Sequence, residues 1–217
     1  MNPAPDDETA DLAALVMALI GTRHSVAPKR LHAPGPSPAQ LLQMVEAAAC
    51  APDHRALRPW RLIRIADDQR DALADLFEAC SRERAQAEHD RPSEDELVRS
   101  RDKAYRAPTL LLAVLKGLPD DPEVPITERA ATLGAALMNL LLAAHGLGFG
   151  AMLTSGRAVR SPRFARAMAL AGDEQALCFV SIGSAGSATR RARANPQDLL
   201  SDWTPAAPPT GPVDAGA

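Results

Sequence analysis

Two short segments of this chain combine cationic, imidazole and hydroxyl groups in a way that favours binding of an anionic, aromatic ligand. The first is Arg23-His24-Ser25, and the second is Ala51-Pro52-Asp53-His54-Arg55 with Pro59-Trp60. An arginine forms charge-assisted, often bidentate hydrogen bonds with phosphate, and each proline fixes φ in its loop. We therefore expect the first segment to bind phosphate and the second to form a stiff wall beside the ligand.

Structural interpretations of these groups stay open. Arg23-His24-Ser25 follows a helix-like run, and cations at a helix C-terminus interact favourably with its dipole. A lone loop histidine such as His54 is as often structural as functional. Cys50 lies four residues before it, but the sequence marks no third group that would orient a Cys–His pair for nucleophilic catalysis. The turn Thr154-Ser155-Gly156 either lets a ligand approach the backbone or simply connects two elements.

Composition narrows the class of protein. The 217 residues carry a net charge of -3 and are 46% hydrophobic, which predicts a soluble globular protein and argues against nucleic acid as a partner. Three scattered cysteines do not suggest a disulfide framework or a four-cysteine metal site, so we expect no metal. No signal peptide and no apolar run long enough to span a bilayer is visible, which favours a cytoplasmic protein without membrane contact.

We expect a mobile N-terminus over 1–8, a single domain over 9–204, and a disordered, Pro- and Ala-rich tail over 205–217.

The hydrophobic pattern predicts helices and strands that alternate irregularly. Ser-Pro steps at Ser37 and Ser161 are typical helix starts, and Ser93 to Glu96 reads as a capping box. The continuous apolar run 109–115 is typical of a central buried strand, and the run 127–147 is apolar on nearly all sides, as in a core or interface helix. Helices are expected over 9–21, 39–51, 67–89, 93–105, 127–147 and 161–170, and strands over 60–65, 109–115, 148–155 and 176–182. This pattern predicts an α+β or α/β sandwich with helices on both faces of one sheet.

The glycine cluster Gly146-Leu147-Gly148-Phe149-Gly150 follows a helix. A dinucleotide fingerprint requires a strand, then glycines, then a helix. We therefore do not interpret the cluster as a Rossmann motif.

Taken together, four blocks resemble the nitroreductase family of FMN-dependent oxidoreductases, and its small single-domain subgroup in particular. The block A-P-D-H-(K/R)-x-x-x-P-W is the specific one. The others are Arg23-His24-Ser25, Arg106-Ala107-Pro108 before a buried strand, and the glycine cluster running into Ser155-Gly156. Their order and spacing extend from about residue 12 to about residue 183.

This resemblance implies an α+β fold, a three-layer α-β-α sandwich around a central mixed sheet, and an obligate homodimer. It implies one FMN at each of two interface sites, with NADH or NADPH as co-substrate and a small-molecule electron acceptor such as a nitroaromatic or a quinone. The cofactor-binding residues that it implies are Arg23, His24, Ser25, Cys50, His54, Leu153, Thr154 and Ser155. No side chain is expected to be catalytic by itself, because the flavin carries the chemistry.

One block departs from the subgroup. Where the subgroup tends to have W-R-S-G, this chain has Leu153-Thr154-Ser155-Gly156, and Arg157, Arg190, Arg191 or Arg193 could supply the missing cation. Two alternatives therefore stay open. One is a different flavin chemistry on the same scaffold, such as dehydrogenation, reductive dehalogenation or flavin breakdown. The other is a non-catalytic dimer that stores flavin or has lost it.

Overall fold

Strand β3 (Thr109–Lys116) forms the centre of the fold, and all of its residues except Lys116 are buried. Its continuous apolar sequence is explained by cover on both faces. Leu111, Ala113 and Leu115 pack into one core, whereas alternate residues such as Leu112 pack into another. The prediction of a central buried strand is confirmed. The computed structural model describes residues 7–117, 123–186 and 192–204.

The sheet has five strands, and β3 pairs with β2 (Trp60–Ile65) and β5 (Glu174–Ala185). β5 also pairs with β4 (Gly150–Thr154) and with the two-residue strand β1 (Leu31–His32). The sheet expected to be mixed is antiparallel in all of these ladders, and its parallel component is a bridge between Ser25 and Ala151. The reason is the strand order: β3 and β4 run in the same direction, but β5 lies between them.

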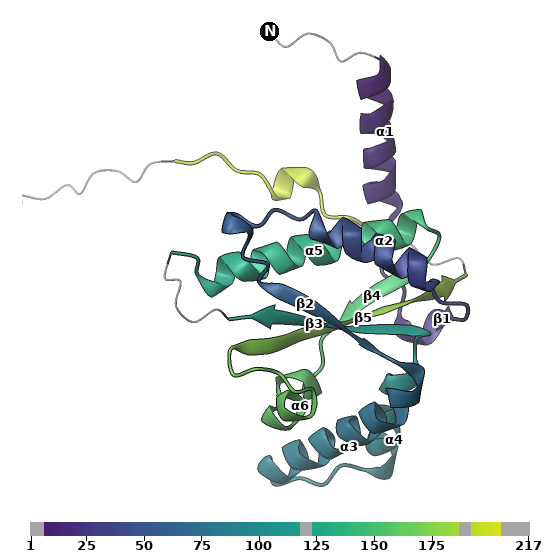
Figure 1. Ribbon diagram of the computed structural model, residues 1–217, viewed down its shortest axis with the longest axis vertical. Coiled ribbons are helices and arrows are strands. Elements are labelled where there is room, and N and C mark those ends of the chain that lie inside the picture. The colour runs from purple at the N-terminus through teal and green to yellow at the C-terminus, as the bar shows by residue number, and fades with distance from the viewer. Residues whose placement is uncertain (1–6, 118–122, 187–191, 205–217) are drawn as a thin grey trace, which may run out of the picture.

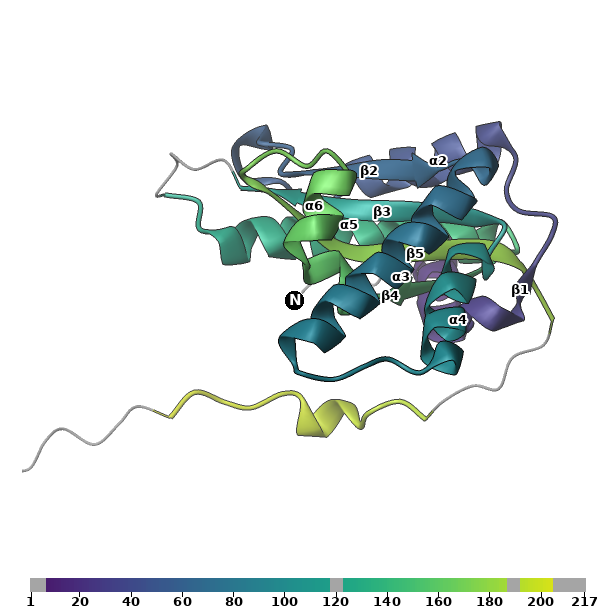
Figure 2. The ribbon, with the colours of Figure 1, turned by 90° about the horizontal axis from the view of Figure 1, so that it is seen from below.

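Helices cover both faces of the sheet (Figures 1 and 2). α2 (Pro38–Ala49) and α5 (Ile126–Gly146) pack on one face. α3 (Arg70–Ala87) and α6 (Pro162–Ala167) pack on the other, and α4 (Glu94–Asp102) lies against α3. The predicted three-layer α-β-α sandwich is therefore confirmed.

The helix starts follow the predicted capping groups. Ser37 and Gln40 form a reciprocal capping box at α2, and Ser93 and Glu96 form a second one at α4. The hydroxyl of Ser161 accepts a hydrogen bond from the backbone N–H of Phe164, which starts α6. These side chains satisfy N–H groups that have no partner within their helix, so local sequence is sufficient to place the starts.

α1 (Asp7–Thr22) stands away from the sandwich, and none of its residues is buried (Figure 1). Its C-terminal end is held at the end of α5, where the hydroxyl of Thr22 lies 2.9 Å from Nε2 of His145. Asp7 and Glu8 belong to this helix and not to the expected mobile N-terminus, because acidic residues complement the dipole at a helix start. The rest of that segment, residues 1–6, and the expected disordered tail, 205–217, lie outside the described residues.

The glycine cluster closes α5 and starts β4, in agreement with its exclusion as a dinucleotide motif. Gly148 has a φ of +84°, a conformation that favours glycine after a helix. A Cβ atom on Gly150 would lie 2.7 Å from Cβ of Ala185 and 2.9 Å from Cδ2 of Leu31. Gly150 therefore allows β4 to pack closely against its neighbours.

Candidate functional site

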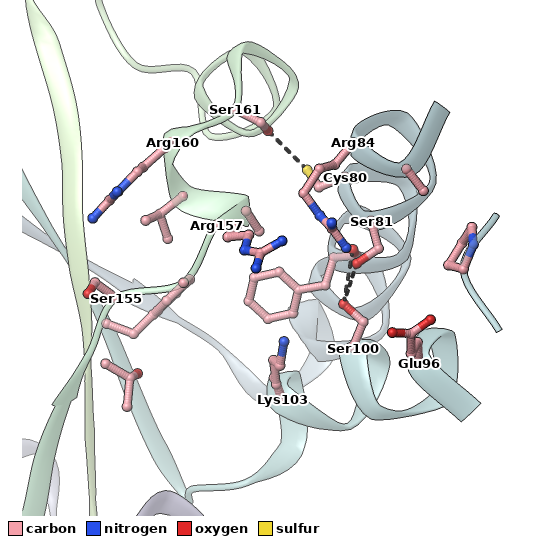
Figure 3. A pocket seen from close by; sticks show the side chains of 18 of the residues that line it. Cys80, Ser81, Arg84, Glu96, Ser100, Lys103, Ser155, Arg157, Arg160 and Ser161 are labelled. Carbon is pink, nitrogen blue, oxygen red and sulfur yellow. Dashed lines mark hydrogen bonds between the residues drawn. The ribbon is translucent and has the colours of Figure 1, made fainter. Parts of the chain in front are cut away.

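A cavity of about 660 Å³ lies between the sheet, α3 and α4 (Figure 3). Thr154 and Ser155, at the end of β4, line it together with Phe77 and Phe179. The two phenylalanine rings meet edge to face, with centroids 5.7 Å apart. The cavity thus places the hydroxyl side chains of Thr154 and Ser155 next to an aromatic pair.

Basic side chains outnumber acidic ones in the lining of this cavity. The basic residues are Arg84, Lys103, Arg106, Arg157 and Arg160, and the acidic residues are Asp90 and Glu96. Both carboxylates bond to nearby backbone. Asp90 accepts a hydrogen bond of 2.7 Å from the N–H of Arg91, and Glu96 accepts one of 2.9 Å from the N–H of Ser93. The cavity is therefore electropositive, although the whole chain carries a net charge of -3.

Lys103 follows α4 directly and lies at the cavity wall (Figure 3). Desolvation lowers the pKa of its ammonium group, and the nearby charges of Arg106 and Arg84 lower that pKa further. Within the part of the chain that the structure describes, the side chains of Lys103 and Arg106 form no hydrogen bond or ion pair. A negatively charged ligand would relieve this accumulation of like charge.

Arg70, at the start of α3, fixes the backbone that carries these two cations. Its guanidinium donates hydrogen bonds of 2.8 Å to the carbonyl of Ala104 and 3.3 Å to the carbonyl of Pro108. The residue is 6% exposed, and burial lowers the pKa of its guanidinium. The segment between Lys103 and Pro108 is therefore bound at both ends by one side chain.

Hydroxyl groups join α3 to α4 beside the cavity. The Ser81 and Ser100 hydroxyls lie 2.9 Å apart, and Ser100 donates to the carbonyl of Phe77. The Cys80 thiol lies 3.2 Å from the hydroxyl of Ser161. The serine contacts fix the distance between α3 and α4, and the Cys80–Ser161 contact joins α3 to the start of α6, so together they determine the shape of the wall.

Arg23-His24-Ser25 lies at the other end of β4. Ser25 forms the parallel bridge with Ala151, and the N–H of the following residue donates to the Ala151 carbonyl at 3.1 Å. Nδ1 of His24 lies 3.1 Å from the carbonyl oxygen of Thr22. β4 therefore connects this segment to Thr154 and Ser155, a distance along the strand of about 10 Å at ~3.4 Å per residue.

His54 and Cys50 lie elsewhere, near the N-terminal end of α5. Nδ1 of His54 lies 2.6 Å from Oε1 of Glu128, and the Cys50 thiol donates to the carbonyl of Glu46. Neither residue lines the cavity. Glu128 therefore orients His54, a role beyond the dipole effect of an acidic residue at a helix start.

α5 separates the two groups of expected cofactor residues within one chain. His54 contacts Glu128 at its beginning, whereas His24 lies beside His145 at its end, with ring centroids 6.3 Å apart. Glu128 and His145 are 17 residues apart on α5, which at a rise of ~1.5 Å per residue corresponds to about 26 Å along the helix. The structure therefore brings Arg23-His24-Ser25 and Leu153-Thr154-Ser155 to one region and leaves Cys50 and His54 in another.

The structure also distinguishes two of the arginines considered for the missing cation. The guanidinium of Arg193 donates a hydrogen bond to the carbonyl of Arg23. Arg157 lines the cavity instead, 4.0 Å from Glu88. Arg190 and Arg191 lie outside the described residues. Arg193 is thus the described candidate that can join Arg23 in binding a phosphate group.

Comparison with known proteins decides the family. Residues 20–184 match the model of the nitroreductase family. The chain belongs to the nitroreductase family. A Haemophilus influenzae relative, provisionally named as an NAD(P)H nitroreductase, is 32% identical over 168 residues that cover 77% of this chain and 87% of the relative. The family resemblance inferred from the four sequence blocks is confirmed.

Solved structures show the same nitroreductase fold. A nitroreductase-like family protein from Bacillus cereus aligns with a TM-score of 0.72 at 18% identity, covering 94% of this chain and 98% of that one. A provisionally named Desulfovibrio desulfuricans nitroreductase, solved in complex with FMN, aligns with a TM-score of 0.65 at 22% identity, covering 87% of this chain and 96% of that one.

Sequence reasoning missed several residues of this nitroreductase cavity. Lys103 and Arg106 read as ordinary charges at a helix end, and Arg70 reads as part of a charged helix. Only the packing of α3 against α4 brings these groups to one wall. The nearest available signal was Arg106-Ala107-Pro108, which resembles the family but does not by itself indicate a place in the site.

Proposed function

We propose that this chain is an FMN-dependent NAD(P)H oxidoreductase that reduces nitroaromatics, quinones or similar small acceptors. The observation that carries the proposal is the position of the electropositive, aromatic-lined cavity at one end of β4, with Arg23-His24-Ser25 at the other. FMN is a molecule of matching polarity, with a planar ring system at one end and a phosphate at the other.

The residues present fit FMN. Arg23 and Arg193 carry the positive charges that a phosphate monoester of roughly two negative charges requires, and Ser25 adds a hydroxyl donor. Thr154 and Ser155 lie where a flavin ring would meet the sheet, and the largely buried Phe77 and Phe179 lie beside them in the cavity lining. Leu153 belongs to the same strand and precedes them.

When bound, FMN would supply two-electron chemistry, accepting a hydride from NADH or NADPH and returning two electrons to the acceptor. The balance is NAD(P)H plus a proton plus acceptor, giving NAD(P)⁺ and the reduced acceptor. Lys103 would place a positive charge beside the ring and so favour its reduced, anionic form. The aromatic surface would exclude water from one side of the cavity.

We infer that the functional form is a homodimer with a shared site. α1 exposes Leu12, Leu15 and Met17, and α5 exposes Met138 on its outer face. Trp203 in the C-terminal segment is 86% exposed. Apolar surface of this extent is typical of an interface. In a symmetric dimer, His54 and Cys50 of the partner subunit could complete the site that begins with Arg23 and Thr154 of the first.

No helix among the described residues has the length and apolar character needed to cross a membrane. Cys50, Cys80 and Cys178 are free thiols. Free thiols are stable in a reducing compartment, so we propose a cytoplasmic location.

The visible absorbance spectrum of the purified protein tests this function. We expect flavin bands with or without added FMN, and we expect them to bleach anaerobically with NADPH or NADH and return when nitrobenzene or a quinone is added. A protein that stays colourless after incubation with FMN would support the non-catalytic scaffold. Flavin bands that persist with both nicotinamides would favour a different flavin chemistry.

A further inference from the structure

We propose that the basic wall of the cavity selects electron acceptors that carry an anionic group, such as aromatic nitro compounds or quinones bearing a carboxylate. This inference rests on the proposed oxidoreductase function and names the substrate class of that site. It concerns Arg84, Arg106 and Arg157, which the binding of FMN phosphate by Arg23 and Arg193 would leave available.

Arg84 and Arg157 reach the same part of the wall from different elements (Figure 3). Arg84 extends from α3, and Arg157 follows β4. Both approach Glu88, at 2.6 Å and 4.0 Å respectively. Glu88 itself does not line the cavity, and one carboxylate balances only one of the two guanidinium groups. A positive charge therefore remains at this edge.

Arg106, in the segment between α4 and β3, adds to this positive charge. It lies close enough to Lys103 to lower the pKa of the lysine ammonium group, as does Arg84. Lys103 would serve the flavin, so Arg106 and the Arg84–Arg157 pair remain for a second anion. The lining carboxylates, Asp90 and Glu96, bond to their own local backbone.

The shape and the charge together indicate the class of ligand. The bound flavin ring would supply the surface on which an aromatic acceptor lies, because Phe77, Phe179 and Val159, which also line the cavity, are each only 5–6% exposed. Cations around a cavity with low-dielectric walls raise the local concentration of anions. Guanidinium groups match the geometry of carboxylates and phosphates. An aromatic acceptor with a carboxylate on its ring satisfies both features, whereas a neutral acceptor satisfies only the first.

A matched pair of acceptors tests the proposal on the FMN-loaded protein. 4-Nitrobenzoate and 4-nitrobenzamide have nearly the same shape but differ in charge. We expect kcat/KM to be about tenfold higher for the carboxylate, equivalent to about 1.4 kcal/mol, which is close to the lower end of the range for a hydrogen bond to a charged group. In the double variant Arg84→Gln/Arg157→Gln this preference should fall to about twofold or less, mainly through KM. Arg99→Gln removes an exposed arginine of α4 outside the cavity and should keep the preference.

The nicotinamide co-substrate also carries phosphates, so the reductive half-reaction is measured separately. The rate of flavin bleaching by NADPH without an acceptor should be the same in the double variant as in the wild type. A slower bleaching with an unchanged acceptor preference would show that the arginines bind the co-substrate phosphate, and it would overturn the proposal. Equal kcat/KM values for the two acceptors in the wild type would also overturn it.

Binding of benzoate and benzamide, which are not reduced, gives a second readout. We expect benzoate to perturb the flavin spectrum at concentrations about tenfold lower than benzamide, in a manner that depends on Arg84 and Arg157. If the protein holds no FMN, calorimetric titration with the same compounds still tests the anion preference. Selective benzoate binding by a flavin-free protein would support the anion site and overturn the proposed function.

Discussion

The guanidinium of Arg70 donates a 2.8 Å hydrogen bond to the carbonyl of Ala104, the residue directly after Lys103. The same guanidinium binds Pro108, so one buried cation determines where the cavity lysine lies. An arginine that is 6% exposed gives up much of its hydration. Its two carbonyl partners partly compensate for this loss, and they connect α3 to the segment before β3.

Arg70→Met should destabilise the protein by about 1–3 kcal/mol, because two carbonyl groups lose a charged donor. Urea unfolding measures this loss. Arg82→Gln is the matched control on the same helix, since Arg82 pairs with Glu78 on the exposed side and should cost about 0.5 kcal/mol or less. Equal losses in the two variants would show that Arg70 has no special structural role.

Lys103→Met should lower the midpoint potential of the bound flavin. Loss of a cation that favours the reduced flavin by about 1–3 kcal/mol corresponds to about 20–60 mV for a two-electron couple. Lys103→Arg should keep most of the wild-type potential. Redox titration against dyes of known potential provides the measurement, and a potential unchanged in Lys103→Met would exclude a contact with the flavin.

The same lysine should make that potential depend on pH. Desolvation lowers the pKa of Lys103, so its charge is lost at a lower pH than that of an ordinary lysine. As the pH rises through that lowered pKa, the difference in potential between wild type and Lys103→Met should shrink. The difference between Lys103→Arg and Lys103→Met should persist over the same range.

Arg23→Ala should weaken FMN binding by about 1.5–3 kcal/mol, the range for a hydrogen bond to a charged group. Arg193→Gln should weaken it in the same direction, because Arg193 bonds to the Arg23 carbonyl. FMN fluorescence titration gives the dissociation constants. Arg166→Gln, an exposed arginine of α6, is the control. An Arg23→Ala variant that binds FMN as tightly as the control would remove Arg23 from the phosphate site.

The ion pair between Arg61 and Glu174 should stabilise the fold in a pH-dependent way. The two N–H···O distances are 2.7 and 2.8 Å, and this contact lowers the pKa of Glu174 to about 2. A lowered pKa gives stability that is complete above the ordinary value of 4.5 and is lost as the pH falls towards about 2. The stabilisation is about 1–2 kcal/mol, since the Arg61 side chain is 38% exposed.

Glu174→Gln therefore should reduce the free energy of unfolding at pH 7, and the difference from wild type should shrink below pH 4.5. Denaturation at several pH values measures this change. Glu83→Gln, which removes an exposed ion pair with Arg163, should change stability less at every pH. A Glu174→Gln deficit that stays constant down to pH 3 would contradict the assignment.

Met138→Arg should convert the proposed dimer into monomers at micromolar concentration and weaken FMN binding together with it. Met138 lies on the outer face of α5, and a buried unpaired charge there opposes association. Val98→Arg makes the same change at an exposed apolar residue of α4 and should leave the assembly intact. Analytical ultracentrifugation distinguishes the outcomes. A wild type that sediments as a monomer would contradict the dimer itself.

The helix starts, the central strand and the layered architecture were predictable because their causes are local. Serine caps and the apolar run of β3 act within a few residues of chain. β1 was missed because its two residues lie in a proline-rich segment and form a strand only by pairing with β5. The order of strands, which makes the ladders antiparallel, also depends on tertiary packing.

The candidate site was predictable only in part. Arg23-His24-Ser25 and Thr154-Ser155 could be named from sequence because they belong to the blocks that resemble the family, whereas their proximity depends on the tertiary bridge between Ser25 and Ala151. Lys103, Arg106 and Arg70 acquire their places from the packing of α3, α4 and the sheet, which a charged-residue pattern does not encode. Arg193 approaches Arg23 across 170 positions of sequence, so its contact was one of several options until the fold was known.

The length of α5 has a consequence for how chains of this kind can diverge. The helix spans the distance between Glu128, which holds His54, and His145, which holds Thr22 beside Arg23-His24-Ser25. One inserted residue would shift one end relative to the other by ~1.5 Å and rotate it by about 100°. In a dimer with shared sites, both sites would be displaced at once. Insertions are therefore expected in the loops around this helix and selected against within it.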